Sequence, residues 1–233
     1  MRGLYAIVDV DALEALELPI VAFAQAVARA HPTALQLRHK RGGARETLKL
    51  LCALRTVTAA EGVALYANDW VDLAALAGCD GVHLGQHDLG VEAARRVAAL
   101  LGAPALRVGA SVHNAEELAR TLAARPDYVA IGPVFPTRNK LRPDPTLGLG
   151  GLAALVAEVR RAGLPAVAIG GIDTRNAREV GAVCPVVAVI GALVPRSFDA
   201  DVVTERAAEL ARLVAEAPHL TLVAPAAKRT RPT

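Results

Sequence analysis

Residues 127–140, DYVAIGPVFPTRNK, hold the densest set of chemically useful side chains in the sequence. Tyr128 to Ile131 has the apolar pattern of a buried strand, and Gly132-Pro133 ends that strand in a rigid turn. The loop that follows offers hydrogen-bond donors and positive charge from Thr137, Arg138, Asn139 and Lys140. A buried strand ending in such a loop is typical of a barrel enzyme that binds an anionic substrate, although a basic surface loop is an equal alternative for this stretch alone.

A second basic group, Gln36, Arg38 and Lys40, alternates with Leu35 and Leu37. Because successive strand residues point to opposite faces, the three polar side chains share one face and the leucines share the other. A face with an amide and two cations is a poor core but suits an anion. The alternative is a charged strand edge in solvent.

Two carboxylates are candidate metal ligands. Asp69 follows Asn68 at the end of one predicted strand, and Asp88 follows the next predicted strand. Mg²⁺ prefers hard oxygen ligands, few protein contacts and room for a substrate phosphate. Asp69 could instead cap a helix at Val71, and Asp88 could be a turn residue. Opposite a basic group, the pair favours a magnesium site.

Glycines mark the ends of the last two predicted strands, at Gly170-Gly171 and at Gly191. Backbone N–H groups at these places recurrently bind phosphate in barrel folds. Ser111 and His113 follow the fifth predicted strand, where capping or the start of a helix explains them as well as a binding role does.

These residues together predict two anion sites and one divalent-ion site, with Thr137 and Lys140 between them. Such a site suggests the joining of two phosphorylated small molecules, or the departure of a diphosphate. The sequence carries no paired acid/base carboxylates, no nucleophilic Cys–His arrangement and no serine-triad motif.

The elements that would position these residues alternate along the chain. The predicted strands are Leu4–Val8, Ala34–Arg38, Ala64–Ala67, Gly81–Leu84, Arg107–Ala110, Tyr128–Ile131, Ala166–Ile169 and Val186–Ile190. The predicted helices are Ile20–Ala30, Arg45–Ala60, Val71–Ala77, Val91–Leu101, Ala115–Ala124, Gly151–Ala162, Thr174–Val180 and Ala200–Ala215. Asn114 and Asp173 stand at N-cap positions, and Gly62 and Gly163 stand where helices should end.

Strict alternation of eight strands and eight helices predicts an α/β fold, a single (β/α)8 TIM barrel. An open doubly wound sheet would normally carry a glycine-rich nucleotide turn after its first strand. Here that strand ends in Asp9 and no GxGxxG follows. We expect residues 1–217 to form the catalytic barrel and residues 218–233 to form a loose tail.

Composition restricts the class of protein. The chain has 233 residues, 53% of them hydrophobic, which is enough for the core of one barrel. Three Phe, three Tyr and one Trp are too few for base-stacking platforms, so we expect no nucleic-acid partner. No apolar run reaches the ~18 residues that cross a bilayer, and the three cysteines lack the spacing of a disulfide framework or a zinc site. We therefore expect a cytoplasmic protein without a membrane partner; a homo-oligomer is compatible with the sequence.

Several sequence blocks, in order, resemble the thiamine-phosphate synthase family over residues 4–192. They are LYAIVD, QLRHK, ANDWVDLA, GVHLGQHDL, VGASVHN, DYVAIGPVFPT..K, GLGGL and VAIGGI. The resemblance implies a transferase that joins hydroxymethylpyrimidine diphosphate to hydroxyethylthiazole phosphate, forms thiamine phosphate and releases pyrophosphate.

The resemblance also implies residue roles. It assigns the pyrimidine diphosphate to Gln36, Arg38, Lys40, Asn68, Ser111 and Lys140, and it assigns Mg²⁺ to Asp69 and Asp88. It assigns the thiazole phosphate to Thr137, Gly170, Gly171, Ile190 and Gly191, with Asn139 nearby. Lys40, Ser111 and Lys140 would be catalytic, in a dissociative mechanism in which Mg²⁺ and the lysines stabilise the leaving pyrophosphate.

Three positions depart from the family pattern: Asn139 replaces a hydroxyl residue, Trp70 a common Arg and Gly191 a frequent Ser. These changes bear on substrate affinity more than on the type of reaction.

Two other functions are compatible with the same barrel. One is a thiazole tautomerase-like enzyme, a branch that tends to lose the metal and diphosphate residues and to carry a His in the loop after the sixth strand. The other is a non-catalytic, phosphate-binding regulatory barrel, which needs no metal site. The retained Asp69, Asp88, Lys40 and Lys140 favour the synthase.

Overall fold

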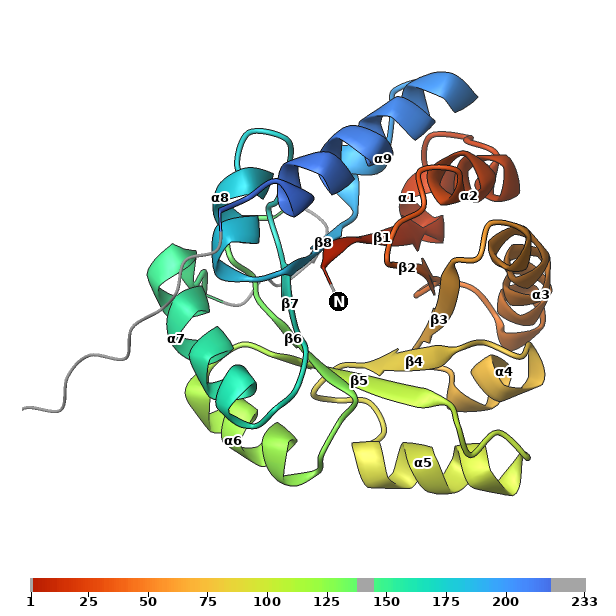
Figure 1. The fold of residues 1–233 in the computed structure, drawn as a ribbon. Coiled ribbons are helices and arrows are strands. Elements are labelled where there is room, and N and C mark those ends of the chain that lie inside the picture. Colours follow the sequence, from red (N-terminus) through yellow and green to blue (C-terminus); the bar gives the residue numbers. More distant parts are fainter. Residues whose placement is uncertain (1, 138–144, 219–233) are drawn as a thin grey trace, which may run out of the picture.

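The computed structural model describes residues 2–137 and 145–218. Within these residues eight parallel strands close into a barrel in sequence order, and the helices surround it (Figure 1). The strands are β1 Gly3–Asp9, β2 Ala34–Arg38, β3 Ala64–Asn68, β4 Gly81–Leu84, β5 Arg107–Val112, β6 Tyr128–Ile131, β7 Ala166–Ile169 and β8 Val186–Val189. The predicted (β/α)8 barrel is confirmed.

The helices follow the strands along the chain. They are α1 Val10–Glu14, α2 Ile20–Ala28, α3 Ala44–Ala60, α4 Val71–Leu76, α5 Val91–Leu100, α6 Ala115–Ala123, α7 Gly148–Arg161, α8 Ala177–Val183 and α9 Ala200–Ala215, with a 3-10 turn η1 at Gly191–Leu193. The short elements α1 and η1 are absent from the sequence prediction, because so few residues show no helical period. Among the described residues, no helix is long and apolar enough to cross a membrane.

The predicted element boundaries differ from the structure in two informative places. Strand β5 runs on to Val112, so Ser111 lies inside the strand rather than after it. Helix α8 begins three residues later than predicted, because the Asp173 side chain accepts a hydrogen bond from the Arg175 N–H (2.9 Å) in a turn before the helix. The predicted cap at Asn114 is confirmed, since its Oδ1 accepts from the Glu117 N–H at 2.9 Å.

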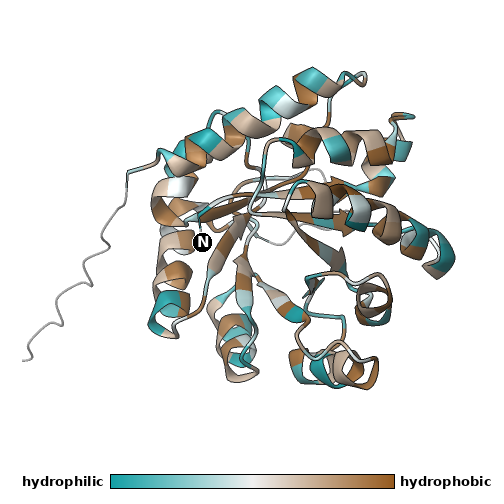
Figure 2. Ribbon diagram, turned by 45° about the vertical axis from the view of Figure 1, so that its right-hand side comes forward, coloured by the Kyte–Doolittle hydropathy of each residue, from teal (hydrophilic) through white to brown (hydrophobic). Residues whose placement is uncertain are grey.

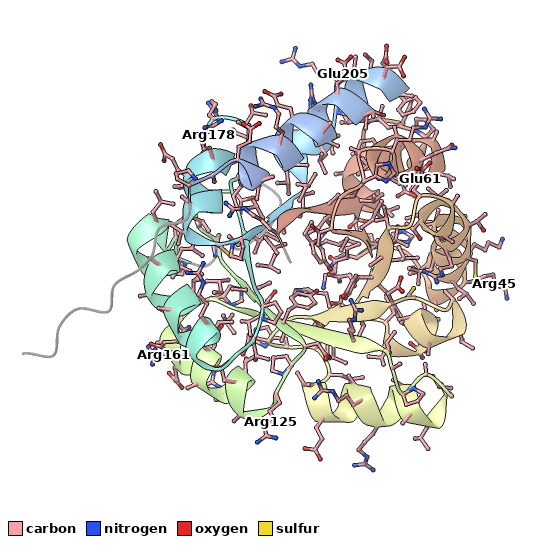
Figure 3. The ribbon with its side chains drawn as sticks, in the orientation of Figure 1. Arg45, Glu61, Arg125, Arg161, Arg178 and Glu205 are labelled. Carbon is pink, nitrogen blue, oxygen red and sulfur yellow. The ribbon has the colours of Figure 1, made fainter. Side chains whose placement is uncertain are left out.

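The strand residues alternate between two cores. Leu35 and Leu37 of β2 are buried against the helices, while Ala34 and Gln36 face the barrel interior. Hydrophobic strands therefore lie inside a ring of helices with hydrophilic outer stripes (Figure 2). Charged side chains such as Arg45, Arg161 and Glu205 lie at the outer rim (Figure 3).

Three tyrosines fill the barrel interior below the carboxyl ends of the strands. The ring centroids of Tyr5, Tyr66 and Tyr128 lie 5.7 to 6.0 Å apart, within the range of favourable aromatic contacts. Two glycines make room for these rings: a Cβ atom at Gly81 would lie 2.2 Å from Tyr66, and one at Gly109 would lie 2.0 Å from Tyr128. The tyrosine layer therefore depends on the missing side chains at both positions.

We expect Gly109→Ala to lower the free energy of unfolding by about 1–3 kcal/mol, because the added methyl group would overlap the Tyr128 ring. Thermal denaturation should show a Tm lower by roughly 2–4 °C for each kcal/mol. Gly150→Ala in α7 is the matched control, since an added Cβ meets nothing within 4 Å there and helix propensity favours Ala. A Gly109→Ala protein as stable as the Gly150→Ala protein would contradict this account.

Candidate active site at the carboxyl ends of the strands

A cavity of about 820 Å³ opens at the carboxyl ends of the strands, and every strand contributes to its lining. Its size is that of a small-molecule site. All predicted site residues within the described part of the chain line this cavity: Gln36, Arg38, Lys40, Asn68, Asp69, Asp88, Ser111, Thr137, Gly170, Gly171, Ile190 and Gly191. Asn139 and Lys140 lie outside the described residues. Which substrate each residue binds stays a prediction.

Asp69 lies at the mouth of the cavity in an unusual backbone conformation. Its φ angle is +66°, a left-handed value that costs a non-glycine residue energy and is common at functional sites. The alternative that Asp69 caps α4 is wrong: the N-cap residue is Trp70, and no side chain caps this helix. The Asp69 carboxylate instead accepts a hydrogen bond from Lys40 Nζ at 2.5 Å.

Asp88 has two contacts that bear on its role. Its Oδ2 accepts a hydrogen bond from the Gly85 N–H at 2.7 Å, which closes the turn after β4, so the predicted turn role is correct. Its carboxyl group is also hydrogen-bonded to that of Asp69. Asp88 is thus a turn residue whose carboxylate also belongs to the cavity.

The pKa values of the two carboxyl groups shift in opposite directions because the groups interact with each other. Burial and the hydrogen bond with Asp88 raise the pKa of Asp69 to about 6, against the opposite effect of Lys40. Burial alone would raise the pKa of Asp88, but the hydrogen bond with Asp69 and the Gly85 N–H lower it overall. Two hard oxygen donors this close fit a divalent cation, as predicted for Asp69 and Asp88.

Another group of ligand-type side chains lies outside the cavity. Atoms of Asp11, Glu14 and His39 lie within 4.8 Å of one another, the one such group of three among the described residues. Arg41 forms an ion pair with Asp11 at 3.7 Å, and Glu14 is exposed. None of the three residues lines the cavity, whereas Asp69 and Asp88 both do.

The basic group on β2 carries less free charge than its sequence indicates. Arg38 forms an ion pair of 2.6 Å with Asp9, which is 3% exposed and also accepts from the Ala12 N–H. Lys40 is paired with Asp69. The predicted anion cradle is therefore neutralised by carboxylates before a substrate arrives. Asp9 was not among the predicted site residues, because its partner on β2 is distant in sequence.

Packing between loops explains why residues 170 and 171 are glycines, apart from any contact with a phosphate. Their φ angles are +106° and +66°, and a Cβ at either position would lie 2.6 Å from atoms of the loop after β6. That loop is hydrogen-bonded to the end of β7, where Phe135 N–H donates to the Gly170 carbonyl at 3.0 Å. The two glycines let the loops after β6 and β7 pack together and bring Thr137 to the cavity.

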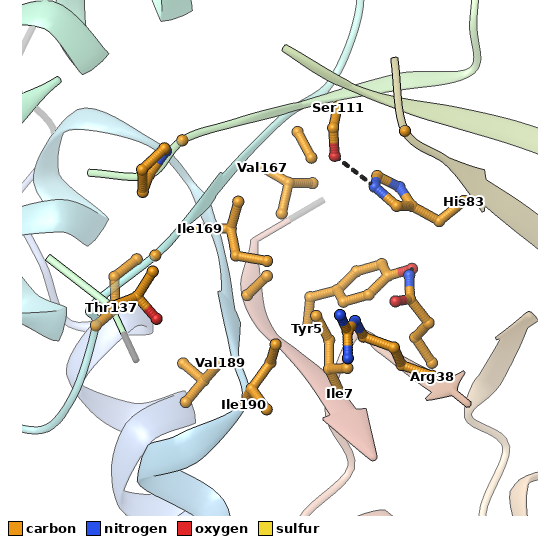
Figure 4. A pocket seen from close by; sticks show the side chains of 18 of the residues that line it. Tyr5, Ile7, Arg38, His83, Ser111, Thr137, Val167, Ile169, Val189 and Ile190 are labelled. Carbon is orange, nitrogen blue, oxygen red and sulfur yellow. Dashed lines mark hydrogen bonds between the residues drawn. The ribbon is translucent and has the colours of Figure 1, made fainter. Parts of the chain in front are cut away.

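One wall of the cavity is apolar. Val167, Ile169 and Ile190 face it across from Tyr5, Arg38 and His83 (Figure 4). An apolar wall opposite polar groups suits the face of a flat heteroaromatic ring.

His83 is a cavity residue that the sequence reasoning missed. It lies on β4, and its Nε2 is 2.7 Å from Ser111 Oγ (Figure 4). Its Nδ1 is 2.9 Å from the Tyr128 hydroxyl. Burial lowers the pKa of His83 to about 4, so the ring is neutral near neutral pH. The alternation of side chains in the predicted strand GVHL places this histidine inside the barrel, so the strand pattern could have identified it as a site residue.

Comparison with known proteins gives a consistent family. The family model described as "Thiamine monophosphate synthase" matches residues 4–193. The chain is 44% identical over 179 residues to the thiamine-phosphate synthase of Koribacter versatilis, covering 76% of this chain and 81% of that protein. It is 42% identical over 203 residues to the thiamine-phosphate synthase of Chromobacterium violaceum, covering 86% and 90%.

Solved structures agree. The thiamine phosphate pyrophosphorylase from Pyrococcus furiosus has a TM-score of 0.78 and 33% identity, covering 93% of this chain and 96% of that one. The 2-keto-3-deoxy-6-phosphogluconate aldolase from Zymomonas mobilis, at 19% identity and a TM-score of 0.63 over 91% and 93% of the two chains, shares the fold alone.

We expect Mg²⁺ to bind in competition with the proton of Asp69. Since the folded-state pKa of Asp69 is raised to about 6, its carboxyl group is protonated below that pH and ionised above it. The apparent Mg²⁺ affinity should therefore be constant above about pH 7 and fall by about tenfold per pH unit below about pH 6. Calorimetric titration with Mg²⁺ at several pH values measures this. An affinity that does not change between about pH 5 and 7 would contradict it.

Proposed function

The chain belongs to the thiamine monophosphate synthase family, and we propose that it joins a pyrimidine diphosphate to a thiazole phosphate in this cavity, with Mg²⁺ as its metal. It is a transferase of thiamine biosynthesis, which moves a pyrimidinylmethyl group to the thiazole nitrogen and forms thiamine phosphate and pyrophosphate. One observation carries the mechanistic part: paired carboxylates beside a lysine lie at the mouth of a cavity with an apolar wall.

The paired carboxylates support a role in diphosphate departure. Asp69 and Asp88 fit Mg²⁺, which when bound there would neutralise charge on the leaving pyrophosphate. Lys40 lies 2.5 Å from Asp69 and adds a positive charge at the same place. Arg38, fixed by Asp9, keeps a second positive charge in the cavity lining. Charge stabilisation of this kind lowers the barrier without a protein nucleophile.

The remaining side chains position the two substrates. We assign the pyrimidine diphosphate to Gln36, Arg38, Lys40, Asn68, Ser111 and Lys140, and the thiazole phosphate to Thr137, Asn139, Gly170, Gly171, Ile190 and Gly191. The apolar wall would bind the faces of the rings and help to hold the reacting atoms close together, and such positioning supplies much of the rate in a reaction of two bound molecules. No cysteine from the described residues lines the cavity, which agrees with chemistry that needs no covalent intermediate.

The tautomerase-like and regulatory alternatives are less well supported. Neither alternative requires two adjacent carboxylates in the cavity, whereas this chain retains Asp69 and Asp88, which interact with each other there. Of the departures from the family, Trp70 does not line the cavity and Gly191 does. A cytoplasmic location and a homo-oligomer stay predictions.

We expect the purified protein, incubated with Mg²⁺, hydroxymethylpyrimidine diphosphate and hydroxyethylthiazole phosphate, to form thiamine phosphate and pyrophosphate in equal amounts. Chelation of the metal should stop the reaction, and added Mg²⁺ should restore it. Chromatography of thiamine phosphate with an enzymatic pyrophosphate assay measures both products. Isomerisation of a thiazole substrate without condensation would overturn the proposal in favour of the tautomerase.

We expect Asp69→Asn to lower kcat by about 10²-fold or more, because a metal contributes several kcal/mol of charge stabilisation and each ~1.4 kcal/mol is tenfold in rate. The variant should also lose its dependence on Mg²⁺ concentration. Asp72→Asn is the control, since Asp72 is an exposed carboxylate in the first turn of α4. Full activity of Asp69→Asn would show that its carboxylate binds no catalytic metal.

A further inference from the structure

A chain of hydrogen bonds crosses the barrel interior beneath the cavity. Gln36 Nε2 donates to the Tyr5 hydroxyl at 2.9 Å, and the Tyr5 and Tyr128 hydroxyls lie 3.0 Å apart. The Tyr128 hydroxyl lies 2.9 Å from His83 Nδ1, and His83 Nε2 lies 2.7 Å from Ser111 Oγ. Five side chains from five strands are thus joined end to end.

The direction of every hydrogen bond follows from its first member. Because the Tyr5 oxygen accepts from the Gln36 amide, its own proton points to Tyr128. Tyr128 then donates its single proton to His83 Nδ1, so a neutral His83 carries its proton on Nε2 and donates to Ser111 Oγ. The Ser111 hydroxyl proton is left to point into the cavity.

The reverse direction needs the opposite orientation of the Gln36 amide. If the Gln36 carbonyl accepted from Tyr5, each proton would shift to the other partner, His83 would carry its proton on Nδ1, and Ser111 would donate to His83. Ser111 would then offer only lone pairs to the cavity. The two ends of the chain are coupled: when Gln36 presents an acceptor to the cavity Ser111 presents a donor, and when Gln36 presents a donor Ser111 presents an acceptor.

Both ends lie in the floor of the cavity. Gln36 is two residues beyond the Ala34 that pairs with Tyr5, and Ser111 is two residues beyond the Gly109 that pairs with Tyr128, so both stand one strand step above the tyrosine layer. Gln36 is 2% exposed, and both residues line the cavity. Lys40 and Asp69, the charged groups at the mouth of the cavity, lie beyond the carboxyl ends of β2 and β3. Because ionised diphosphate oxygens only accept hydrogen bonds, a floor with one acceptor and one donor suits a ring better than a diphosphate.

We propose that this chain of hydrogen bonds makes His83 a positioning residue, which fixes Gln36 as an acceptor and Ser111 as a donor toward a ring with one amine and one ring nitrogen. An aminopyrimidine has that pattern: its amine donates to Gln36, and a ring nitrogen accepts from Ser111. The proposal rests on the proposed function only for the identity of the ring. The coupling of Gln36 and Ser111 is a property of the unliganded protein.

The interior environment keeps the chain of hydrogen bonds neutral. Burial raises the pKa of Tyr5 and of Tyr128 and lowers that of His83, so none of the three is charged near neutral pH. A neutral chain has only the two directions described, because each hydroxyl has one proton to donate.

The tautomer of His83 tests the coupling without any substrate. In full-length protein with ¹⁵N-labelled histidine, we expect the chemical shift of His83 Nδ1 to be that of an unprotonated nitrogen and the shift of Nε2 to be that of a protonated nitrogen. Gln36→Glu supplies an obligate acceptor to Tyr5 and should convert His83 to the Nδ1-protonated tautomer. The measurement is made at a pH where the ¹³C shift of the introduced carboxyl group shows that this group is ionised. An Nδ1-protonated ring in the unaltered protein, or a tautomer unchanged by Gln36→Glu, overturns the proposal.

Two tyrosine variants provide matched controls. Tyr66 lies in the same layer, but its hydroxyl interacts with Arg107 and takes no part in the chain of hydrogen bonds. Tyr66→Phe should therefore leave the effect of Gln36→Glu on His83 intact. Tyr128→Phe removes the middle link and should abolish that effect; if Tyr128→Phe does not fold, Tyr5→Phe breaks the same chain.

Kinetics then connect the chain of hydrogen bonds to the ring. With Tyr128→Phe we expect the KM for the pyrimidine diphosphate to rise about tenfold and the KM for the thiazole phosphate to change less than about twofold. Tyr66→Phe should change neither by more than about twofold. Equal changes for both substrates would show a general structural role and overturn the positioning role. If the unaltered protein makes no thiamine phosphate, the proposed function fails, while the tautomer measurement still decides the coupling.

Discussion

The hydrogen bond between Tyr5 and Tyr128 joins β1 to β6 across the interior of the barrel, and the cavity floor depends on it. Polar groups placed there need partners, since each unsatisfied one costs about 1–3 kcal/mol. The tyrosines supply partners to Gln36 on one side and to His83 on the other. No buried side-chain nitrogen or oxygen in the described part of the chain lacks a hydrogen bond. The tyrosine rings can therefore fill the barrel interior while polar groups line the cavity above them, which is what a site for two small molecules needs.

The charges above this floor are arranged in compensated pairs. Arg38 is paired with Asp9, Lys40 is paired with Asp69, and Asp69 interacts in turn with Asp88. A cation and a polyanionic substrate would exchange these partners rather than meet unpaired charges, so neither state leaves a charge buried alone. The left-handed backbone of Asp69 directs its carboxylate to this meeting point instead of to the helix that follows.

The fold could be predicted because the apolar patterns of strands and helices are local and period-specific. The site residues could be placed because parallel strands bring their carboxyl ends together, which is why Gln36, Asp69 and Gly170 share one cavity despite their separation in sequence. Contacts between such residues could not be predicted, and the Asp9–Arg38 pair and the chain from Tyr5 to His83 depend on closure of the barrel. Lys140, on which the sequence argument relied, lies outside the described residues.

Gly81 and Gly109 limit how the floor can change. Each aromatic ring occupies the volume where its neighbouring strand would otherwise carry a side chain, at Gly81 for Tyr66 and at Gly109 for Tyr128. A smaller residue in place of either tyrosine would leave a hole that an alanine at the paired glycine could partly fill, whereas the alanine alone would collide with the ring. The glycine of each pair can therefore be enlarged only after its tyrosine has been replaced by a smaller residue. A deeper pocket for a bulkier ring would therefore come from the smaller residue with the glycine kept, whereas the added alanine would restore the packing and give up that space.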